Sequence, residues 1–182
     1  MNDLSINKDQ VRSHETAVIE QQGQYLTFLV ADEALGIAIN DVKEIIEITS
    51  ITHVPMTPDY IRGVINLRGN VVPVVDLSAR LGHQVSELSK RSCIVLVEVS
   101  CNDEKQSLGM LVDQVKEILD IPEDHIQPAP TFGTNIRVEF IQAMGRVEDE
   151  FIILLEISRV LSVSELAELS LMTAAEPAAV LA

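Results

Sequence analysis

The chain has 182 residues, of which 47% are hydrophobic, and its formal net charge is −15 at pH 7. This length and composition predict a packed core in one ordinary domain or two very small ones. The acidic charge repels phosphate backbones and anionic lipid surfaces, and aromatic residues, at 3%, are too few for base stacking, so nucleic acid is not an expected partner. No apolar run approaches the roughly 20 residues of a membrane-spanning helix, and residues 1–24 hold no apolar block typical of a secretory signal.

Polar segments flank the apolar middle of the chain. Residues 1–23 are charged and amide-rich, and we expect them to form a disordered tail. Near the other end, Ser162 and Glu165 have the spacing of a capping box, which predicts a short helix. We expect residues 170–182 to be a flexible tail, so the folded domain is predicted to span 24–169.

The apolar positions between the tails mostly alternate or run continuously, which predicts β-strands. Short helical turns are expected at 40–45, 78–81 and 158–161. No stretch between strands is long enough, with helical period, to be the crossover of a parallel sheet, so antiparallel sheets in small barrels are expected. The predicted strands are 25–31, 35–39, 63–67, 71–77, 92–99, 106–112, 138–144 and 151–157.

An internal repeat divides this middle region. Gly36–Ile48 recurs as Gly109–Ile121, at an offset of 73 residues, and Val71–Leu81 recurs as Phe151–Leu161, at an offset of 80. The order of elements is the same in both copies, which indicates two related units at about 25–81 and 92–161. Each unit is near the lower size limit for independent folding, so we expect the two to share an interface and a groove.

The common catalytic and ligand-binding motifs are missing from the sequence. No histidine pair has metal-ligand spacing, and no glycine-rich phosphate loop or G-x-S-x-G elbow occurs. Cys93 and Cys101 lack the close pairing of a zinc or redox motif, and Cys93 is expected to be a reduced, buried thiol. We therefore expect no catalytic site, no cofactor and no metal site.

Asp76 and Glu156 stand at equivalent points of the two repeats and resemble a catalytic carboxylate pair. Because each follows a repeated strand and precedes a predicted helical turn, capping that turn is the favoured interpretation over acid–base chemistry.

A candidate recognition feature is the turn at Arg68. Gly69 and Asn70 can supply the positive φ angles of a tight hairpin, which would leave Arg68 exposed beside a rigid turn on an acidic protein. There it could pair with a carboxylate or a backbone oxygen. The second repeat has Glu148–Glu150 at this place, so the arginine is specific to the first unit. A merely solvated turn arginine is the alternative interpretation.

Asp41–Ile48 and its repeat form a second candidate feature. Val42, Ile45 and Ile46 have helical spacing, and Glu44 falls on another face. A groove between two barrels, rimmed by such segments, would accommodate an amphipathic partner helix. The alternative is that the apolar residues face the core and the charges are simply solvated.

Three segments resemble a known family. Pro55–Leu77 is similar to the signature of the CheW family of chemotaxis coupling proteins, and Leu111–Leu119 and Ile126–Phe132 are similar to its later motifs. The resemblance runs in order from about residue 24 to 169. It implies an all-β fold with short helices, in which two SH3-like five-stranded β-barrels are intertwined. The regulatory domain of the kinase CheA and the first part of CheV share this fold. Because we expect no ATP-binding, phosphotransfer or receiver domain here, a stand-alone CheW is the better fit.

The resemblance also implies a function. A CheW protein is a non-catalytic adaptor that couples the cytoplasmic tips of chemoreceptors to the histidine kinase CheA and places the kinase under receptor control. It implies a cytoplasmic protein, monomeric when isolated and not inserted in the membrane, that is recruited to membrane-associated receptor arrays.

The positions that match the family's contacts fall into two sets. The receptor-facing set is Val42, Glu44, Gly63, Arg68 and Ile118. The kinase-facing set is Gln127 and Phe132. Family members often have a basic residue where Gln127 stands, and Ala143 replaces a glycine that is common in the final strand motif.

Two alternatives stay open from the sequence. A CheW-like adaptor of another chemosensory array, for example one that controls pili, would use the same surface. A small β-barrel enzyme or ligand-binding barrel would need a polar pocket, and turnover or tight small-molecule binding by the pure protein would favour it.

Overall fold

The computed structural model describes residues 23–101, 103–130 and 136–160. Four predictions concern residues outside these ranges: the disordered tail up to residue 22, the helix after Ser162, the flexible tail 170–182 and the kinase contact at Phe132.

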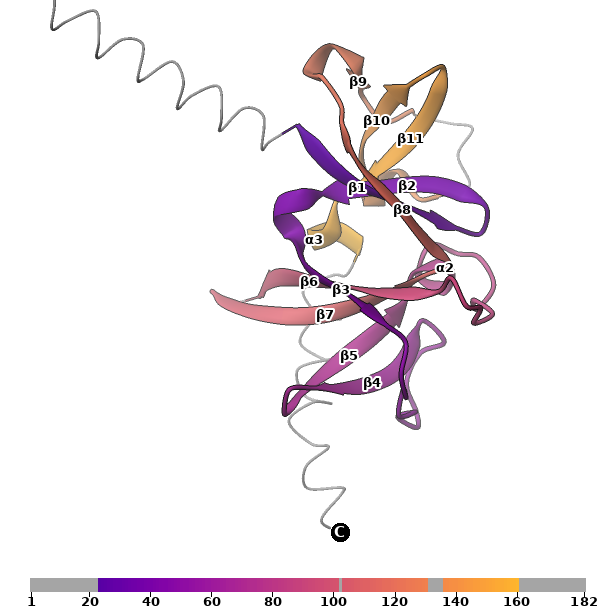
Figure 1. The fold of residues 1–182 in the computed structure, drawn as a ribbon, viewed down its shortest axis with the longest axis vertical. Coiled ribbons are helices and arrows are strands. Elements are labelled where there is room, and N and C mark those ends of the chain that lie inside the picture. The colour runs from indigo at the N-terminus through magenta and orange to yellow at the C-terminus, as the bar shows by residue number, and fades with distance from the viewer. Residues whose placement is uncertain (1–22, 102, 131–135, 161–182) are drawn as a thin grey trace, which may run out of the picture.

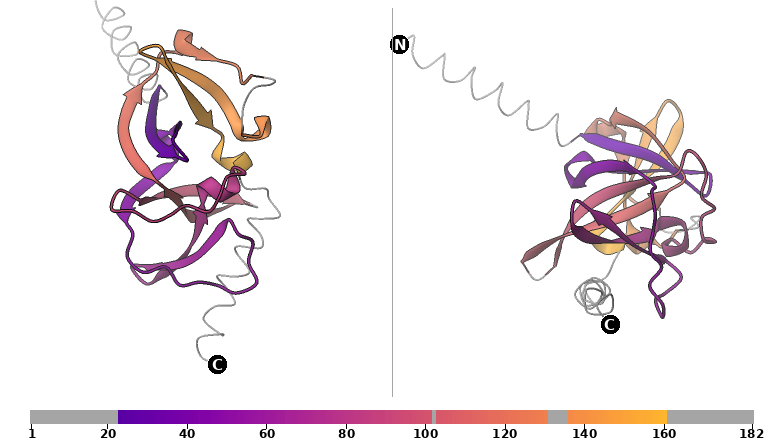
Figure 2. Two further views of the ribbon diagram at one scale, coloured as in Figure 1. Left: turned by 90° about the vertical axis from the view of Figure 1, so that its right-hand side faces the viewer. Right: turned by 60° about the horizontal axis from the view of Figure 1, so that its bottom comes forward.

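The described residues form two β-sheets, which Figures 1 and 2 show as an upper and a lower lobe. The upper sheet has the strand order β8-β1-β2-β11-β10-β9, and the lower sheet has the order β3-β6-β7-β5-β4. The strands are β1 (Gln24–Val30), β2 (Glu33–Ala38), β3 (Val42–Glu47), β4 (Ile61–Leu67), β5 (Asn70–Asp76), β6 (Cys93–Cys101), β7 (Glu104–Val112), β8 (Gln114–Asp120), β9 (Ile126–Gln127), β10 (Ile141–Val147) and β11 (Glu150–Leu155). The helices are η1 (Ile39–Asp41), α2 (Leu77–Arg80), η2 (Glu123–His125), η3 (Val138–Phe140) and α3 (Ile157–Val160).

The two repeats are intertwined through exchanged hairpins. The β1–β2 hairpin of the first repeat lies in the upper sheet, between β8 and β11 of the second repeat. The β6–β7 hairpin of the second repeat lies in the lower sheet, between β3 and β5 of the first. Each sheet is therefore built from both repeats, which confirms the predicted intertwined SH3-like barrels.

The prediction that all strand pairs are antiparallel is wrong at two places. β5 pairs with β7 in parallel, and β11 pairs with β2 in parallel. A parallel pair needs a long connection, and the sequence has no helical segment of crossover length between consecutive strands. Here each parallel pair joins strands from different repeats, and other strands provide the connection. In the chain, β6 lies between β5 and β7, and β3 to β10 lie between β2 and β11.

The segment 40–45, predicted as a helical turn, is mostly a strand. Only η1 (Ile39–Asp41) is helical, and β3 then pairs with β6. Along β3, Val42, Glu44 and Ile46 are half-buried while the residues between them are exposed. That alternation is the two-residue period of a strand, so the helical spacing assigned to Val42, Ile45 and Ile46 was wrong.

Each sheet closes on itself after its edge strand. In the lower sheet, Thr52 forms a two-bond bridge with Val64 of β4, with N–O distances of 2.8 and 2.9 Å. In the upper sheet the equivalent closure is β9, where Gln127 pairs with Met144 of β10. These closures bring the opposite edges of each sheet together, which makes each a small barrel.

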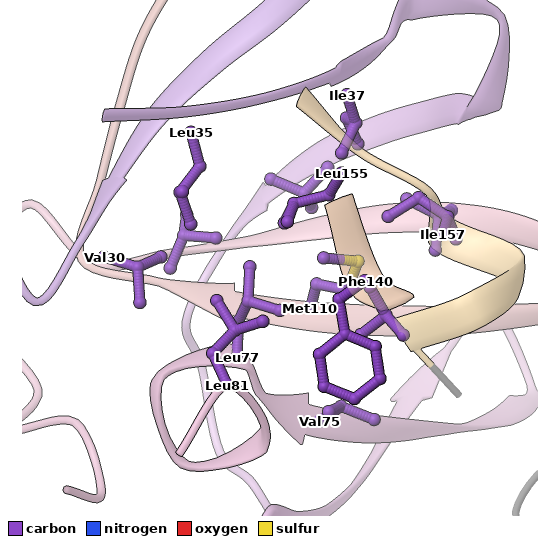
Figure 3. Close-up of a cluster of buried hydrophobic side chains, with 14 of the residues drawn as sticks. Val30, Leu35, Ile37, Val75, Leu77, Leu81, Met110, Phe140, Leu155 and Ile157 are labelled. Carbon is purple, nitrogen blue, oxygen red and sulfur yellow. The ribbon is translucent and has the colours of Figure 1, made fainter. Parts of the chain in front are cut away.

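One continuous hydrophobic core joins the two barrels. It contains Phe28 and Leu77 from the first repeat and Leu108 and Leu155 from the second, each at most 1% exposed. Figure 3 shows its side chains converging from both sheets and from α3. Because the apolar surface of each repeat is buried against the other, neither repeat has a complete core of its own.

Candidate partner-binding surfaces

The Arg68 turn is a two-residue hairpin loop between β4 and β5. Leu67 pairs with Asn70, and the central residues Arg68 and Gly69 have φ angles of 52° and 85°. Two positive φ angles define a type I′ turn, whose twist matches that of the flanking strands. The sequence prediction placed these angles at Gly69 and Asn70, one residue too late, because Asn70 already belongs to the strand. Asn66 adds rigidity, since its Oδ1 accepts a hydrogen bond from the Gly69 N–H at 3.0 Å.

Two predicted receptor-facing residues meet at this turn. The Arg68 guanidinium donates to Glu44 Oε1 at 2.8 Å, and the side chains are 72% and 34% exposed. An ion pair this accessible contributes only about 0–1 kcal/mol to stability. The pair therefore adds little to stability, and both the guanidinium and the carboxylate stay accessible beside a rigid turn.

Val42 and Gly63 lie beneath that surface and are not prominent on it. Val42 is half-buried and packs against the main core. Gly63 is buried in β4 with a φ of 141°, and a Cβ there would lie 2.2 Å from the Thr52 carbonyl oxygen. The glycine is therefore required for the Thr52–Val64 closure. Any influence of Gly63 on a partner passes through the shape of the barrel.

Ile118 lies apart from the Arg68 turn. It sits on β8 opposite Leu26 and is 53% exposed. Its equivalent in the first repeat is Ile45, which is 44% exposed on β3 beside Glu44. Figure 1 shows β8 running through the upper barrel and the β4–β5 turn at the lower end of the molecule. The structure thus brings Glu44 and Arg68 together and leaves Ile118 on a separate part of the surface.

Gln127, the described member of the kinase-facing set, is exposed on β9 at the edge of the upper sheet. Ala143, the other departure from the family pattern, is 8% exposed within β10 and packs in an apolar cluster. The glycine-to-alanine difference is therefore accommodated inside the barrel and does not alter its surface.

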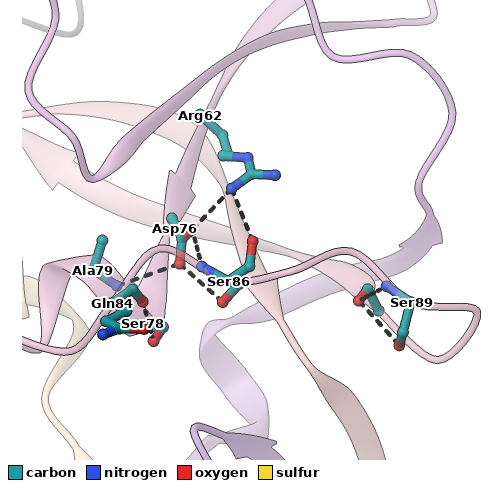
Figure 4. A network of polar contacts seen from close by, with 8 residues as sticks. Arg62, Asp76, Ser78, Ala79, Gln84, Ser86 and Ser89 are labelled. Atoms are coloured by element: carbon teal, nitrogen blue, oxygen red, sulfur yellow. Dashed lines mark hydrogen bonds and ion pairs between the residues drawn. The ribbon is translucent and has the colours of Figure 1, made fainter.

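Asp76 is fully buried and held by a polar network, drawn in Figure 4. Its carboxylate accepts from the Ala79 N–H at 3.3 Å, which caps α2, and from the Ser86 N–H at 2.8 Å. Arg62 approaches it at 3.4 Å and also donates to the Ser86 carbonyl at 3.0 Å. These contacts confirm capping as the role of Asp76 and fasten the chain after α2 to the barrel. A carboxylate so enclosed has no access to a substrate.

The equivalent Glu156 has different surroundings. It accepts from the Ser158 hydroxyl at 3.0 Å, and position 142, which matches Arg62, is glutamine. Its charge acts on Asp41: burial, together with the negative Glu156, raises the pKa of the Asp41 carboxyl above its ordinary value of 3.8.

An open hollow of about 800 Å³ lies beside the β1–β2 turn. Asp32, Asp113, His83 and Glu87 line it, together with the serines that follow α2. None of the predicted contact residues belongs to it, and neither β3 nor β8 forms its rim. The hollow is therefore not the predicted groove between segments 41–48 and 114–121.

Cys93 is a free thiol, half-buried instead of fully buried as predicted, and its Sγ donates to the Arg91 carbonyl at 3.4 Å. Within residues 23–101, 103–130 and 136–160, no three His, Cys, Asp or Glu side chains converge as metal ligands would. In the same part of the chain, no helix has the length and apolar character to cross a membrane.

Sequence reasoning missed Arg80, which links the two repeats. Its Cζ lies 5.0 Å from the centre of the Tyr60 ring and 4.9 Å from that of Phe140. A signal was present, since Tyr60 and Phe140 are equivalent at the repeat offset of 80 residues. Nothing in the sequence indicated that the equivalent residues meet.

The geometry defines a class of protein: a duplicated, all-β double barrel with an exposed ion pair at a rigid hairpin turn. The profile of the CheW-like domain family matches residues 24–165. The chain is 36% identical over 137 residues to the chemotaxis protein CheW of Rhizobium meliloti, covering 75% of this chain and 86% of that one. It is 31% identical over 144 residues to the chemotaxis protein CheW of Klebsiella aerogenes, covering 79% and 84%.

A solved structure agrees with the sequence comparisons. The crystal structure of the scaffolding protein TtCheW from Thermoanaerobacter tengcongensis superposes with a TM-score of 0.69 at 35% identity, over 78% of this chain and 88% of that one. The chain therefore belongs to the CheW family.

Proposed function

We propose that this chain is a non-catalytic chemotaxis adaptor that couples the cytoplasmic tips of chemoreceptors to the histidine kinase CheA. The relatives named above are chemotaxis and scaffolding proteins, and the chain covers most of their length. The observation that carries the proposal is the Glu44–Arg68 pair on a rigid turn of the first barrel. Both residues stand at positions where the family contacts receptors.

The charge of the surroundings supports the role of Arg68. The chain carries 28 acidic and 13 basic residues, so a cation exposed on its surface is a minority charge that an acidic partner group can recognise. At the equivalent turn of the second repeat, Glu148 and Asp149 take the two central positions with φ angles of 49° and 66°. The turn type is thus maintained without arginine. The hairpin does not need Arg68, which supports partner recognition as its role; a merely solvated turn arginine is the alternative that the binding experiment tests.

A direct binding experiment tests the receptor contact. Arg68→Ala is compared with Arg146→Ala, which removes an exposed arginine beside the equivalent turn, paired with Asp149 at 3.1 Å. Binding to membrane-inserted receptors is measured by co-sedimentation. Losing a charge-assisted contact at an interface costs about 2 kcal/mol or more, so Arg68→Ala is expected to bind more than about tenfold more weakly. Equal binding by both variants would remove Arg68 from the receptor surface.

The kinase contact is proposed at Gln127, on the other barrel, and at Phe132, which is outside the described residues. Gln127 is exposed at a sheet edge, where a partner strand or side chain can reach it. Because it is uncharged, the contact depends on hydrogen bonding and packing and not on a charge pair. Kinase binding is therefore expected to depend on salt less than an ion-paired contact would. A non-flagellar array would use the same contacts, so the proposal concerns receptor-to-kinase coupling whichever output the kinase drives.

A further inference from the structure

The two repeats meet at a pair of equivalent aromatic residues. Tyr60 precedes β4 and Phe140 precedes β10, at the repeat offset of 80 residues. Their backbone carbonyls form equivalent hydrogen bonds: the Tyr60 carbonyl accepts from the Asp76 N–H at 2.7 Å, and the Phe140 carbonyl accepts from the Glu156 N–H at 3.0 Å. Each ring thus lies at the start of the strand pair that leads to a short helix, α2 or α3.

Arg80 breaks this symmetry. Its guanidinium carbon lies 5.0 Å from the centre of the Tyr60 ring and 4.9 Å from the centre of the Phe140 ring. Its Nε donates a hydrogen bond to the Val160 carbonyl of α3. Val160 occupies in the second repeat the position that Arg80 occupies in the first. One half-buried arginine of the first repeat therefore contacts two elements of the second repeat, α3 and η3.

Between the two barrels, these contacts differ in kind from the shared core. The shared core is apolar, and apolar burial is strong but has no preferred direction. A guanidinium is planar and donates along fixed directions, and its attraction to an aromatic ring depends on its position over that ring. The core opposes separation of the barrels. The contacts of Arg80 join α2, which follows β5 of the lower sheet, to η3 and α3, which adjoin β10 and β11 of the upper sheet, and so specify how one barrel is oriented against the other.

We infer that Arg80 is a positioning residue that fixes the relative orientation of the two barrels, and that receptor control of the kinase depends on it. The second half of this inference rests on the proposed function, because it concerns transmission between a receptor-facing barrel and a kinase-facing one. The first half concerns the fold alone and is tested separately.

Orientation is measured by the distance between spin labels placed on opposite barrels. In the full chain, with Cys93 and Cys101 replaced by serine, the labels are attached to Glu47→Cys on β3 and Glu123→Cys in η2, both exposed positions. With Arg80 present, the distance distribution is expected to be a single narrow peak. Arg80→Met is expected to lose that narrow peak, and Arg80→Lys, which keeps a cation beside the rings, is expected to recover much of it.

Arg62→Met is the matched control. Arg62 is also a half-buried arginine, but its contacts are with Asp76 and Ser86, both of which precede the second repeat in the chain. Arg62→Met should therefore leave the distance distribution between the two labels narrow, even if the substitution lowers the stability of the fold. A narrow peak in Arg80→Met, or equal broadening in Arg62→Met, would overturn the positioning role. If Arg80→Met does not fold, Tyr60→Leu is used: it removes one ring, keeps the bond to Val160, and should also broaden the peak. A narrow peak there would equally overturn the inference.

A functional experiment distinguishes the binding of each partner from the transmission of the receptor signal to the kinase. Arg80→Met is expected to bind receptors alone and kinase alone like the parent protein, while receptor-dependent kinase activation falls about tenfold, within the usual range of coupling between sites. A general loss of folding would instead weaken all three. If the parent protein itself supports no activation, the proposed function fails and the distance measurement still stands. If activation by Arg80→Met is normal while its peak is broad, orientation is not what transmits the signal.

Discussion

Gly63→Ala is expected to destabilise the fold strongly, although the residue matches a receptor-contact position. The new Cβ would lie 2.2 Å from the Thr52 carbonyl oxygen and 2.8 Å from its carbon, both backbone atoms that move only with the chain. The φ of 141° adds conformational strain of about 1–2 kcal/mol for a non-glycine residue. Relieving the clash breaks the two Thr52–Val64 hydrogen bonds, each worth about 0.5–1.5 kcal/mol.

The expected total loss is therefore about 3 kcal/mol or more, a large share of the 5–15 kcal/mol that stabilises a typical domain. Gly69→Ala is the matched comparison, because its φ is also positive, at 85°, but nothing lies within 4 Å of the new Cβ. It should lose only about 1 kcal/mol. Urea unfolding of both variants measures the difference. If Gly63→Ala loses no more than Gly69→Ala, the barrel closure at Thr52 does not hold as described.

Asp76→Ala is expected to lower the free energy of unfolding by about 2–4 kcal/mol, because Arg62 keeps its charge without its buried partner. It should also make the chain after α2 sensitive to protease, since the bond to the Ser86 N–H is lost, and unchanged proteolysis would contradict this. Because the pKa of Asp41 is raised, its neutral form stabilises the fold below pH 3.8, and this contribution is lost as pH rises through the folded-state pKa. Asp41→Asn should therefore gain stability relative to the parent protein over that rise in pH. A difference in stability that does not change with pH would refute the prediction. Residues 82–182 alone should show no cooperative thermal transition, because the core is shared between repeats; a native-like transition would show that one repeat folds without the other.

The sequence predicted much of the fold because the duplication is visible in it. The offsets between Gly36 and Gly109, and between Val71 and Phe151, already paired the strands that prove equivalent in the two barrels. The exchange of strands between the repeats could not be predicted from hydrophobic periodicity, because periodicity indicates which residues are buried and not which strands are neighbours. Only the family resemblance implied the exchange. The parallel pairs β5–β7 and β2–β11 were missed for the same reason.

Two errors in the sequence prediction each concern a short segment and have separate causes. Over so short a segment, the spacing of Val42, Ile45 and Ile46 also fits a helical period. The segment is a strand because β3 pairs with β6, which the sequence pattern does not indicate. The turn residues were placed one position late, because Arg68 adopts a left-handed φ that a glycine or asparagine usually takes. Of the candidate site, the exposed position of Arg68 was predictable from composition and turn chemistry. Its contact with Glu44 was not, because that contact exists only once the barrel closes.

Receptor-dependent kinase activation, reconstituted from receptors in membranes, the kinase and this protein, tests the central claim most directly. The parent chain is expected to raise receptor-controlled kinase activity as its concentration rises, and addition of a receptor ligand is expected to change that activity. Arg68→Ala should need at least about tenfold more protein for the same activation, with a thermal melt that is almost unchanged, because an exposed side chain contributes within about 0.5 kcal/mol to stability. Full activation by Arg68→Ala at parental concentration, or no activation by the parent chain at any concentration, would contradict the adaptor role proposed for this surface.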